Sequence, residues 1–235
     1  MIEFEDQGVG KSADLPMLGK LEFRDTSHLI PSKYSPPEQS ILERLSSDVE
    51  ALGALIDTES KTNDLLVAEQ GLLPGISPQE LVANVPFASV INGAFTHARP
   101  EGARFNGPDR GAWYAARLRT AQAEVAFHHT AYLEEVGEFF DEVTYDDYLA
   151  DFVGTYHDIR NNKAFESCLD SNSYVDSQSL AERLLAAGSL GLAFPSVRHP
   201  GGACLVCFRP ALVTHVRKGQ TYRFIWQGKS SPTIL

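Results

Sequence analysis

Hydrophobic residues in the first third of the chain recur with a helical period. Leu45, Val49, Leu52 and Ile56 lie three or four residues apart and predict an amphipathic helix over 41–56. A second, short helix is predicted over 64–69, and Ser77-Pro78-Gln79-Glu80 matches a capping box with proline at the first helical position. Residues before Gln39 are rich in proline, serine and charge and show little regular pattern. We therefore expect residues 1–85 to form a mainly helical N-terminal extension.

From residue 86 onward the pattern changes to short apolar or alternating runs. A helical period returns over 120–135 and 177–187, and Gly188 is placed to end the second helix in the left-handed conformation. Strands outnumber helices without regular βαβ alternation, which favours an α+β domain over 86–235 with a mostly antiparallel sheet. The predicted strands are 87–95, 113–116, 143–156, 190–194, 203–209, 212–216 and 222–226.

The net charge of −11 over 235 residues argues against the phosphate backbone of a nucleic acid as a partner. Residues 1–85 hold 15 acidic and 6 basic residues, so the extension carries most of the negative charge. We hypothesise that it selects a basic acceptor protein. The chain lacks a run of 18 apolar residues, and MIEFEDQG lacks the features of a signal peptide, so we expect a cytoplasmic protein.

Cys204 and Cys207 form a lone C-x-x-C within the apolar run Cys204-Leu205-Val206-Cys207-Phe208. Residues three apart on a strand face opposite sides of the sheet. The two thiols therefore cannot share a metal ion, and we expect both to be buried and free. Histidine, cysteine and aspartate spacing does not suggest zinc, and the glycine motifs of P-loop and Rossmann proteins are missing from the sequence.

The candidate chemistry lies in RPEGARFNGPDRGAWYAARLRTAQAEVAFHH, which starts at Arg99. Its glycines and prolines predict an exposed loop that carries Arg99, Arg104 and Arg110. Guanidinium groups suit phosphate because their donors match phosphate oxygens in pairs. Glu124 follows among small and apolar residues on the predicted helix, so it should be partly buried and paired, or line a cleft.

Three motifs, in this order, resemble the RES-domain toxins. Ala103-Arg104-Phe105-Asn106 is similar to the Gly-Arg-Trp-Asn loop of that family, and Ala112-Trp113-Tyr114-Ala115, ahead of Glu124, is similar to its Tyr-to-Glu segment. Phe194-Pro195-Ser196-Val197-Arg198, followed by Gly201-Gly202, looks like its Pro-Ser strand end. The resemblance covers about 86–226, and the long form of this chain looks most like the ParT type.

The resemblance implies an ADP-ribosyltransferase-like fold with a split β core that binds NAD+ in a cleft. It implies a toxin that breaks the nicotinamide–ribose bond and passes ADP-ribose to a protein, to water or to phosphate. It also implies an Xre-like antitoxin of the ParS type that blocks the cleft. A non-catalytic nucleotide-binding module is the alternative of another class.

The same resemblance assigns roles to individual residues. Glu124 would steady positive charge on the ribose, Tyr114 would stack on nicotinamide, and Arg104 would grip the diphosphate. His128, one turn after Glu124, would orient the carboxylate or serve the acceptor. The remaining NAD+-binding residues would be Arg99, Phe105, Asn106, Ser196 and Arg198.

Two positions depart from the family pattern. Phe105 stands where relatives carry tryptophan, although either ring offers an apolar face. Relatives also carry an arginine on the first strand, and residues 87–95 contain none. Either Arg99 or His97 would take over its phosphate contact.

Overall fold

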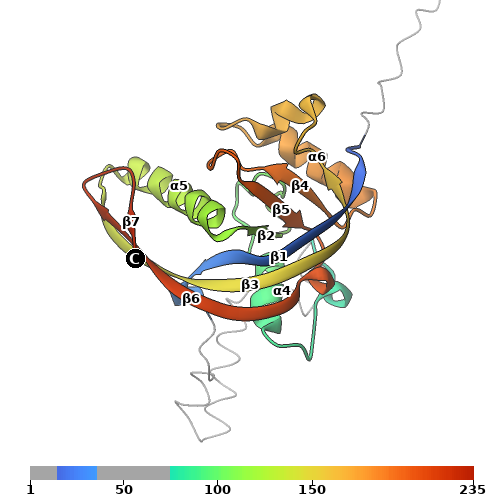
Figure 1. The fold of residues 1–235 in the computed structure, drawn as a ribbon, viewed down its shortest axis with the longest axis horizontal. Coiled ribbons are helices and arrows are strands. Elements are labelled where there is room, and N and C mark those ends of the chain that lie inside the picture. Colours follow the sequence, from blue (N-terminus) through green and yellow to red (C-terminus); the bar gives the residue numbers. More distant parts are fainter. Residues whose placement is uncertain (1–14, 36–74) are drawn as a thin grey trace, which may run out of the picture.

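The computed structural model describes residues 15–35 and 75–235, which form a mixed α and β fold around one sheet (Figure 1). The strands of this part are β1 (Leu18–Pro31), β2 (Trp113–Ala116), β3 (Phe140–Asp158), β4 (Gly191–Pro195), β5 (Ala203–Cys207), β6 (Thr214–Gln227) and β7 (Thr233–Ile234). The α-helices are α4 (Ala88–Thr96), α5 (Leu118–Val136) and α6 (Val175–Ala186). The 3-10 helices are η1 (Ser32–Tyr34), η2 (Pro78–Glu80), η3 (Lys163–Leu169) and η4 (Pro210–Leu212).

The sheet has the order β1-β2-β5-β4-β3-β6-β7, and β1 pairs with β3 as well as with β2. Among these strands only β3 and β4 pair in parallel, which confirms the prediction of a mostly antiparallel sheet. The long strands β1, β3 and β6 form one half, and the short strands β2, β5 and β4 form the other. The two halves meet at Ser27 opposite Ala116 and at His157 opposite Leu192. Five strands thereby close into a ring of hydrogen-bonded pairs.

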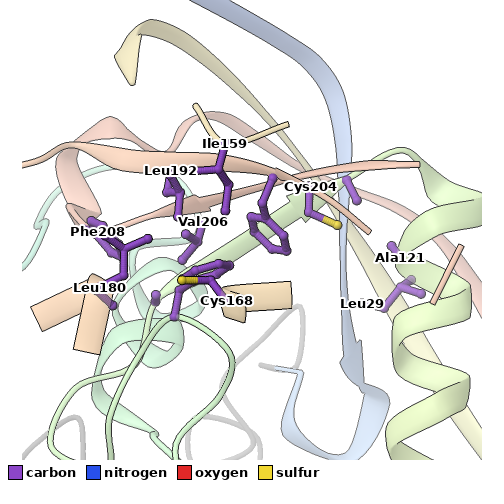
Figure 2. Close-up of a cluster of buried hydrophobic side chains, with 14 of the residues drawn as sticks. Leu29, Ala121, Ile159, Cys168, Leu180, Leu192, Cys204, Val206 and Phe208 are labelled. Atoms are coloured by element: carbon purple, nitrogen blue, oxygen red, sulfur yellow. The ribbon is translucent and has the colours of Figure 1, made fainter. Parts of the chain in front are cut away.

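Two hydrophobic clusters occupy opposite faces of the short strands. Helices α5 and α6 contribute to the first cluster (Figure 2), whereas α4 contributes to the second. In Figure 1, α4 accordingly lies on the other side of the sheet from α5. Cys204 belongs to the first cluster and Cys207 to the second, and both are buried free thiols. The prediction for this pair is confirmed, because successive strand residues alternate between faces.

The predicted strand over 87–95 is wrong, because this segment forms helix α4. Phe87 starts the helix in the left-handed conformation, with φ of 60°. The side chain of Asn92 accepts from Val82 N at 3.0 Å and donates to Val82 O at 2.9 Å. A short apolar run does not distinguish a buried helix from a buried strand. Here the packing of Val90, Ile91 and Phe95 against the sheet decides for the helix.

The expectation of a mainly helical extension over 1–85 is wrong for residues 18–31, which showed little regular pattern in the sequence. Strand β1 covers Leu18–Pro31 and pairs with β3 along this whole length. This part of the chain therefore belongs to the sheet and not to a helical extension. The helices predicted over 41–56 and 64–69, and the hypothesis about acceptor choice that rests on acids in this region, lie outside the described residues.

The other sequence predictions agree with the structure in position. Strands β2, β3, β4 and β5 and helices α5 and α6 occupy the predicted segments, and Gly188 follows α6 with φ of +73°. The two closing strands predicted over 212–216 and 222–226 are instead the single strand β6. The Ser77–Glu80 motif forms only one 3-10 turn, in which Ser77 N donates to Glu80 Oε1 at 3.3 Å. In the described part, no helix is long and apolar enough to cross a membrane.

Glu80 joins this turn to the sheet through two arginines. Its carboxylate accepts from Arg110 Nη1 at 3.0 Å and Nη2 at 2.8 Å, and from Arg209 Nη1 at 2.9 Å. Arg110 Nη2 also donates to the carbonyl of Phe208 at 2.6 Å. The side chain of Arg110 is only 11% exposed, so its charge depends on these partners.

We expect Glu80→Ala to lower the free energy of unfolding by about 2 to 3 kcal/mol, because it leaves a nearly buried guanidinium without its carboxylate. The matched control is Glu142→Ala, which removes an exposed partner of Arg223 and should cost less than about 1 kcal/mol. Urea unfolding of both variants measures the difference, and equal losses would contradict a special role for Glu80.

Candidate active site

The candidate site forms where α5 passes the end of β4. Ser196 follows the last residue of β4, and its hydroxyl donates to Glu124 Oε1 on α5 at 2.6 Å. Ser196 Oγ in turn accepts from the backbone N–H of Arg198 at 3.2 Å and of His199 at 2.9 Å. The sequence predicted that Glu124 would either be partly buried and paired or line a cleft. The structure shows the first alternative, since the residue is half-buried and hydrogen-bonded to Ser196.

Tyr114 on β2 binds the loop that carries Arg104 through its hydroxyl group. Its hydroxyl donates to Asn106 Oδ1 at 2.8 Å and accepts from Phe105 N at 3.0 Å. Burial raises the pKa of this phenol, so it stays protonated at neutral pH. Asn106 is buried as well, and its backbone pairs with that of Ala103 to close the loop. Tyr114 and Asn106 therefore fix the shape of the loop that carries Arg104.

Arg104 is anchored by the backbone at the end of η3 and just after it. Its Nη1 donates to the carbonyl of Cys168 at 3.1 Å and of Asp170 at 2.7 Å. Its guanidinium lies 5.0 Å from the ring centre of Tyr174. Burial lowers the pKa of Arg104, and the charges of Arg198 and Glu124 are close enough to contribute. One side of the guanidinium is thus fixed, and the group lies near the carboxylate of the candidate site.

His128 lies one turn after Glu124, and the charges of three arginines and of Glu101 act on it. Burial, followed by the positive charges of Arg99, Arg198 and Arg104, lowers the pKa of His128 to about 4. The imidazole is therefore neutral at physiological pH. The structure brings together residues that the sequence placed in three separate motifs, and it gives this region a concentrated positive charge.

Arg198, in the loop after β4, contacts the segment after η3 and a side chain of α5. Its Nη2 donates to the carbonyl of Ser171 at 2.6 Å, and its guanidinium carbon lies 3.4 Å from the ring centre of Phe127 on α5. This geometry is a close cation–π contact. Arg198 is therefore held by the same stretch of backbone that anchors Arg104.

Two predicted contributions to the site are corrected by the structure. The side chain of Phe105 has no exposed surface and packs on Phe194 at a ring distance of 4.7 Å. It supports the loop from the core and offers no face to a ligand. Arg110, predicted as part of the arginine loop, is bound to Glu80 and does not join the cluster around His128. The neighbouring His129 is engaged elsewhere, because its Nε2 lies 2.6 Å from Asp141 Oδ2.

The sequence did not indicate Tyr174 or the carbonyls of Cys168 and Asp170. Tyr174 lies in a polar stretch between η3 and α6 without a recognisable motif, and carbonyls carry no sequence signal at all. Only the packing of η3 against the arginine loop shows them. A cavity of about 560 Å³ lies nearby, bordered by η3, α6 and the start of the described chain, and none of the predicted site residues lines it.

The site combines guanidinium groups, which suit an anion, with a carboxylate, which suits a positive charge that develops nearby during a reaction. Arg99, Arg104 and Arg198 are guanidinium groups, whose paired donors match the geometry of phosphate oxygens. Glu124 supplies a negative charge that is oriented by Ser196. Ser196 engages Oε1, and in the described part of the chain no hydrogen bond engages Oε2 of Glu124. This second oxygen is available to a ligand.

The lowered pKa of His128 predicts a pH dependence of stability. Between pH 6.5 and about 4 the unfolded chain binds a proton at this histidine and the folded chain does not. The free energy of unfolding therefore falls as the pH falls through this window. We expect His128→Gln to make that fall smaller, as measured by urea unfolding at several pH values. His28, whose pKa burial also lowers to about 4, should give the same result when changed to glutamine. An unchanged slope in both variants would contradict the argument.

Comparisons with known proteins identify the family of this domain. The sequence matches the RES domain over residues 82–227, a range that includes every residue of the candidate site. A comparison with curated proteins gave no match. Among solved structures, a chain from "Crystal structure of the M.tuberculosis MbcT-MbcA toxin-antitoxin complex" is similar, with a TM-score of 0.41 and 18% identity. The match covers 52% of this chain and 72% of that chain. Since the family match spans well over half of the sequence, this chain belongs to the RES domain family.

Proposed function

We propose that this protein is the toxin of a toxin–antitoxin pair and acts on NAD+. It breaks the nicotinamide–ribose bond and transfers ADP-ribose to a protein side chain. The observation that carries the proposal is the hydrogen bond from Ser196 to Glu124 beside the three arginines around His128, all within the RES domain. The partner would be an Xre-like antitoxin of the ParS type that covers this site.

The leaving group explains why one carboxylate suffices. Nicotinamide departs neutral from a cationic pyridinium, so the reaction needs no general acid. As the bond breaks, positive charge develops on the ribose, as it does in glycoside cleavage. Glu124 would steady that charge and accept from the ribose 2′-OH through Oε2, while Ser196 holds Oε1.

The arginines would bind the diphosphate of NAD+. Arg104 is held at one side by the carbonyls of Cys168 and Asp170, which leaves its other donors to meet a ligand. Arg198 and Arg99 are the additional cations of the cluster. Tyr114 would contact nicotinamide through its ring, because its hydroxyl is already bound to Asn106 and Phe105.

We propose a basic protein as the acceptor of ADP-ribose. The excess of acidic residues over 1–85 favours a basic protein as acceptor. Transfer to water or to phosphate would instead make the protein an enzyme that depletes NAD+. Mass spectrometry of the products formed from NAD+ separates these reactions, and the absence of any nicotinamide release would leave a nucleotide-binding module.

Glu124→Gln should reduce nicotinamide release by about 10² to 10³ and leave NAD+ binding largely intact, because one transition-state charge is lost. The glutamine oxygen still accepts from Ser196, so the local structure is kept. Glu135→Gln, an exposed position on the same helix, is the control. Chromatography of released nicotinamide measures the rate, and wild-type turnover in Glu124→Gln would remove Glu124 from the mechanism.

Arg104→Ala should weaken NAD+ binding by about 1.5 to 3 kcal/mol, the scale of a charge-assisted hydrogen bond. Arg104→Lys should restore little, because a compact ammonium group cannot reproduce the planar fork of donors of a guanidinium group. Arg119→Ala, exposed on α5, is the matched control. Calorimetry with NAD+ gives the affinity, and an unchanged dissociation constant in both Arg104 variants would rule out the phosphate role.

A further inference from the structure

The loop between β4 and β5 makes two side-chain contacts with α5, one helical turn apart. Ser196, at the start of the loop, contacts Glu124, and His199, in its middle, contacts Thr120. Residues four apart lie on the same face of a helix, so both contacts form along one edge of α5. The catalytic candidate Glu124 takes part in one of the two contacts. Thr120 supplies the other and has no role in the chemistry proposed above.

The Thr120–His199 contact is short and enclosed. Thr120 Oγ1 lies 2.8 Å from His199 Nδ1, and Thr120 is only 1% exposed. Gly202 packs against both atoms. A Cβ at that position would lie 2.7 Å from Thr120 Oγ1 and 2.9 Å from His199 Nδ1. The same Cβ would lie 3.0 Å from the backbone carbonyl oxygen of His199, so a side chain at 202 would force the atoms of this contact to shift.

The backbone of His199 connects the Thr120–His199 contact with the Ser196–Glu124 contact. The N–H of His199 donates to Ser196 Oγ at 2.9 Å, and the N–H of Arg198 does so at 3.2 Å. With two donors directed at its oxygen, the hydroxyl of Ser196 is left to donate its proton to Glu124. A continuous network therefore runs from Thr120 through His199 and Ser196 to Glu124.

We propose that His199 is a positioning residue for Glu124. Its ring is anchored on Thr120, and this anchor holds the backbone N–H that orients Ser196, which in turn fixes the carboxylate. The inference rests on the proposed function, because it needs Glu124 to act on the substrate. Loss of the anchor would misplace the carboxylate, and a shift of about 1 Å can cost roughly 10² in rate.

Four variants test the anchor by its atoms. His199→Ala and Thr120→Val remove one partner each, and the valine keeps the shape of the buried threonine. Both should lower kcat for nicotinamide release by about 10- to 100-fold while KM for NAD+ changes by less than about threefold. His199→Asn, whose amide can occupy the place of Nδ1, should keep most of the activity. His199→Gln, whose amide reaches the place of Nε2, should not.

A further pair of variants leaves both partners in place. Gly202→Ala pushes Thr120 and His199 apart and should reproduce the loss of kcat. Gly93→Ala, where a new Cβ would meet only His97 Nδ1 at 3.8 Å, is the control and should behave as the wild type. Thermal unfolding of every variant accompanies the kinetics, and a kcat loss in folded protein supports the proposal.

The outcomes separate the two proposals. If Glu124→Gln abolishes turnover but His199→Ala and Thr120→Val keep the wild-type kcat, the positioning role is overturned and the proposed function stands. If His199→Asn loses as much as His199→Ala and His199→Gln, the Nδ1 contact is not the cause and the inference also falls. If neither the wild type nor any variant releases nicotinamide, the proposed function itself fails.

Discussion

The pairing of β3 with three other strands is the constraint on which the structure depends. β3 pairs with β1 along one edge and with β6 along the other, and its last two residues pair with β4. Because β1 also pairs with β2, these contacts close a ring that places β2 beside β5, and β5 beside β4. Helix α5 follows β2 directly in the chain (Figure 1). Glu124 thereby meets Ser196, 72 residues later in the chain.

Local pattern predicted the elements whose apolar positions repeat over several residues. Helix α5 and strands β2, β4 and β5 were found in this way. β1 was missed because its solvent-facing positions are charged, as Lys20, Glu22 and Arg24 show, and its partner strand lies more than a hundred residues away. The run that became α4 was misread because an apolar segment takes the form that its neighbours allow.

The site was predictable only in part, and for the same reason. The order of Arg104, Glu124 and Ser196 came from resemblance to a family, and the pairing of Glu124 followed from its apolar surroundings. The anchors could not be foreseen. The carbonyls that hold Arg104 and the contact between Thr120 and His199 depend on residues 64 to 79 positions apart. Contacts of this kind arise from the closed sheet and not from any local motif.

The cluster of positive charge raises the question of what holds it together in an acidic protein. Arg104 and Arg198 repel each other, yet both donate to carbonyls of one segment, Cys168–Ser171. These backbone dipoles offset part of the repulsion and fix both guanidiniums before any ligand arrives. His128 stays neutral beside them and adds no further charge. An anion that enters such a site meets donors that are already oriented, so little reorganisation opposes its binding. The segment at the end of η3 therefore holds two like charges in fixed positions through its backbone carbonyls.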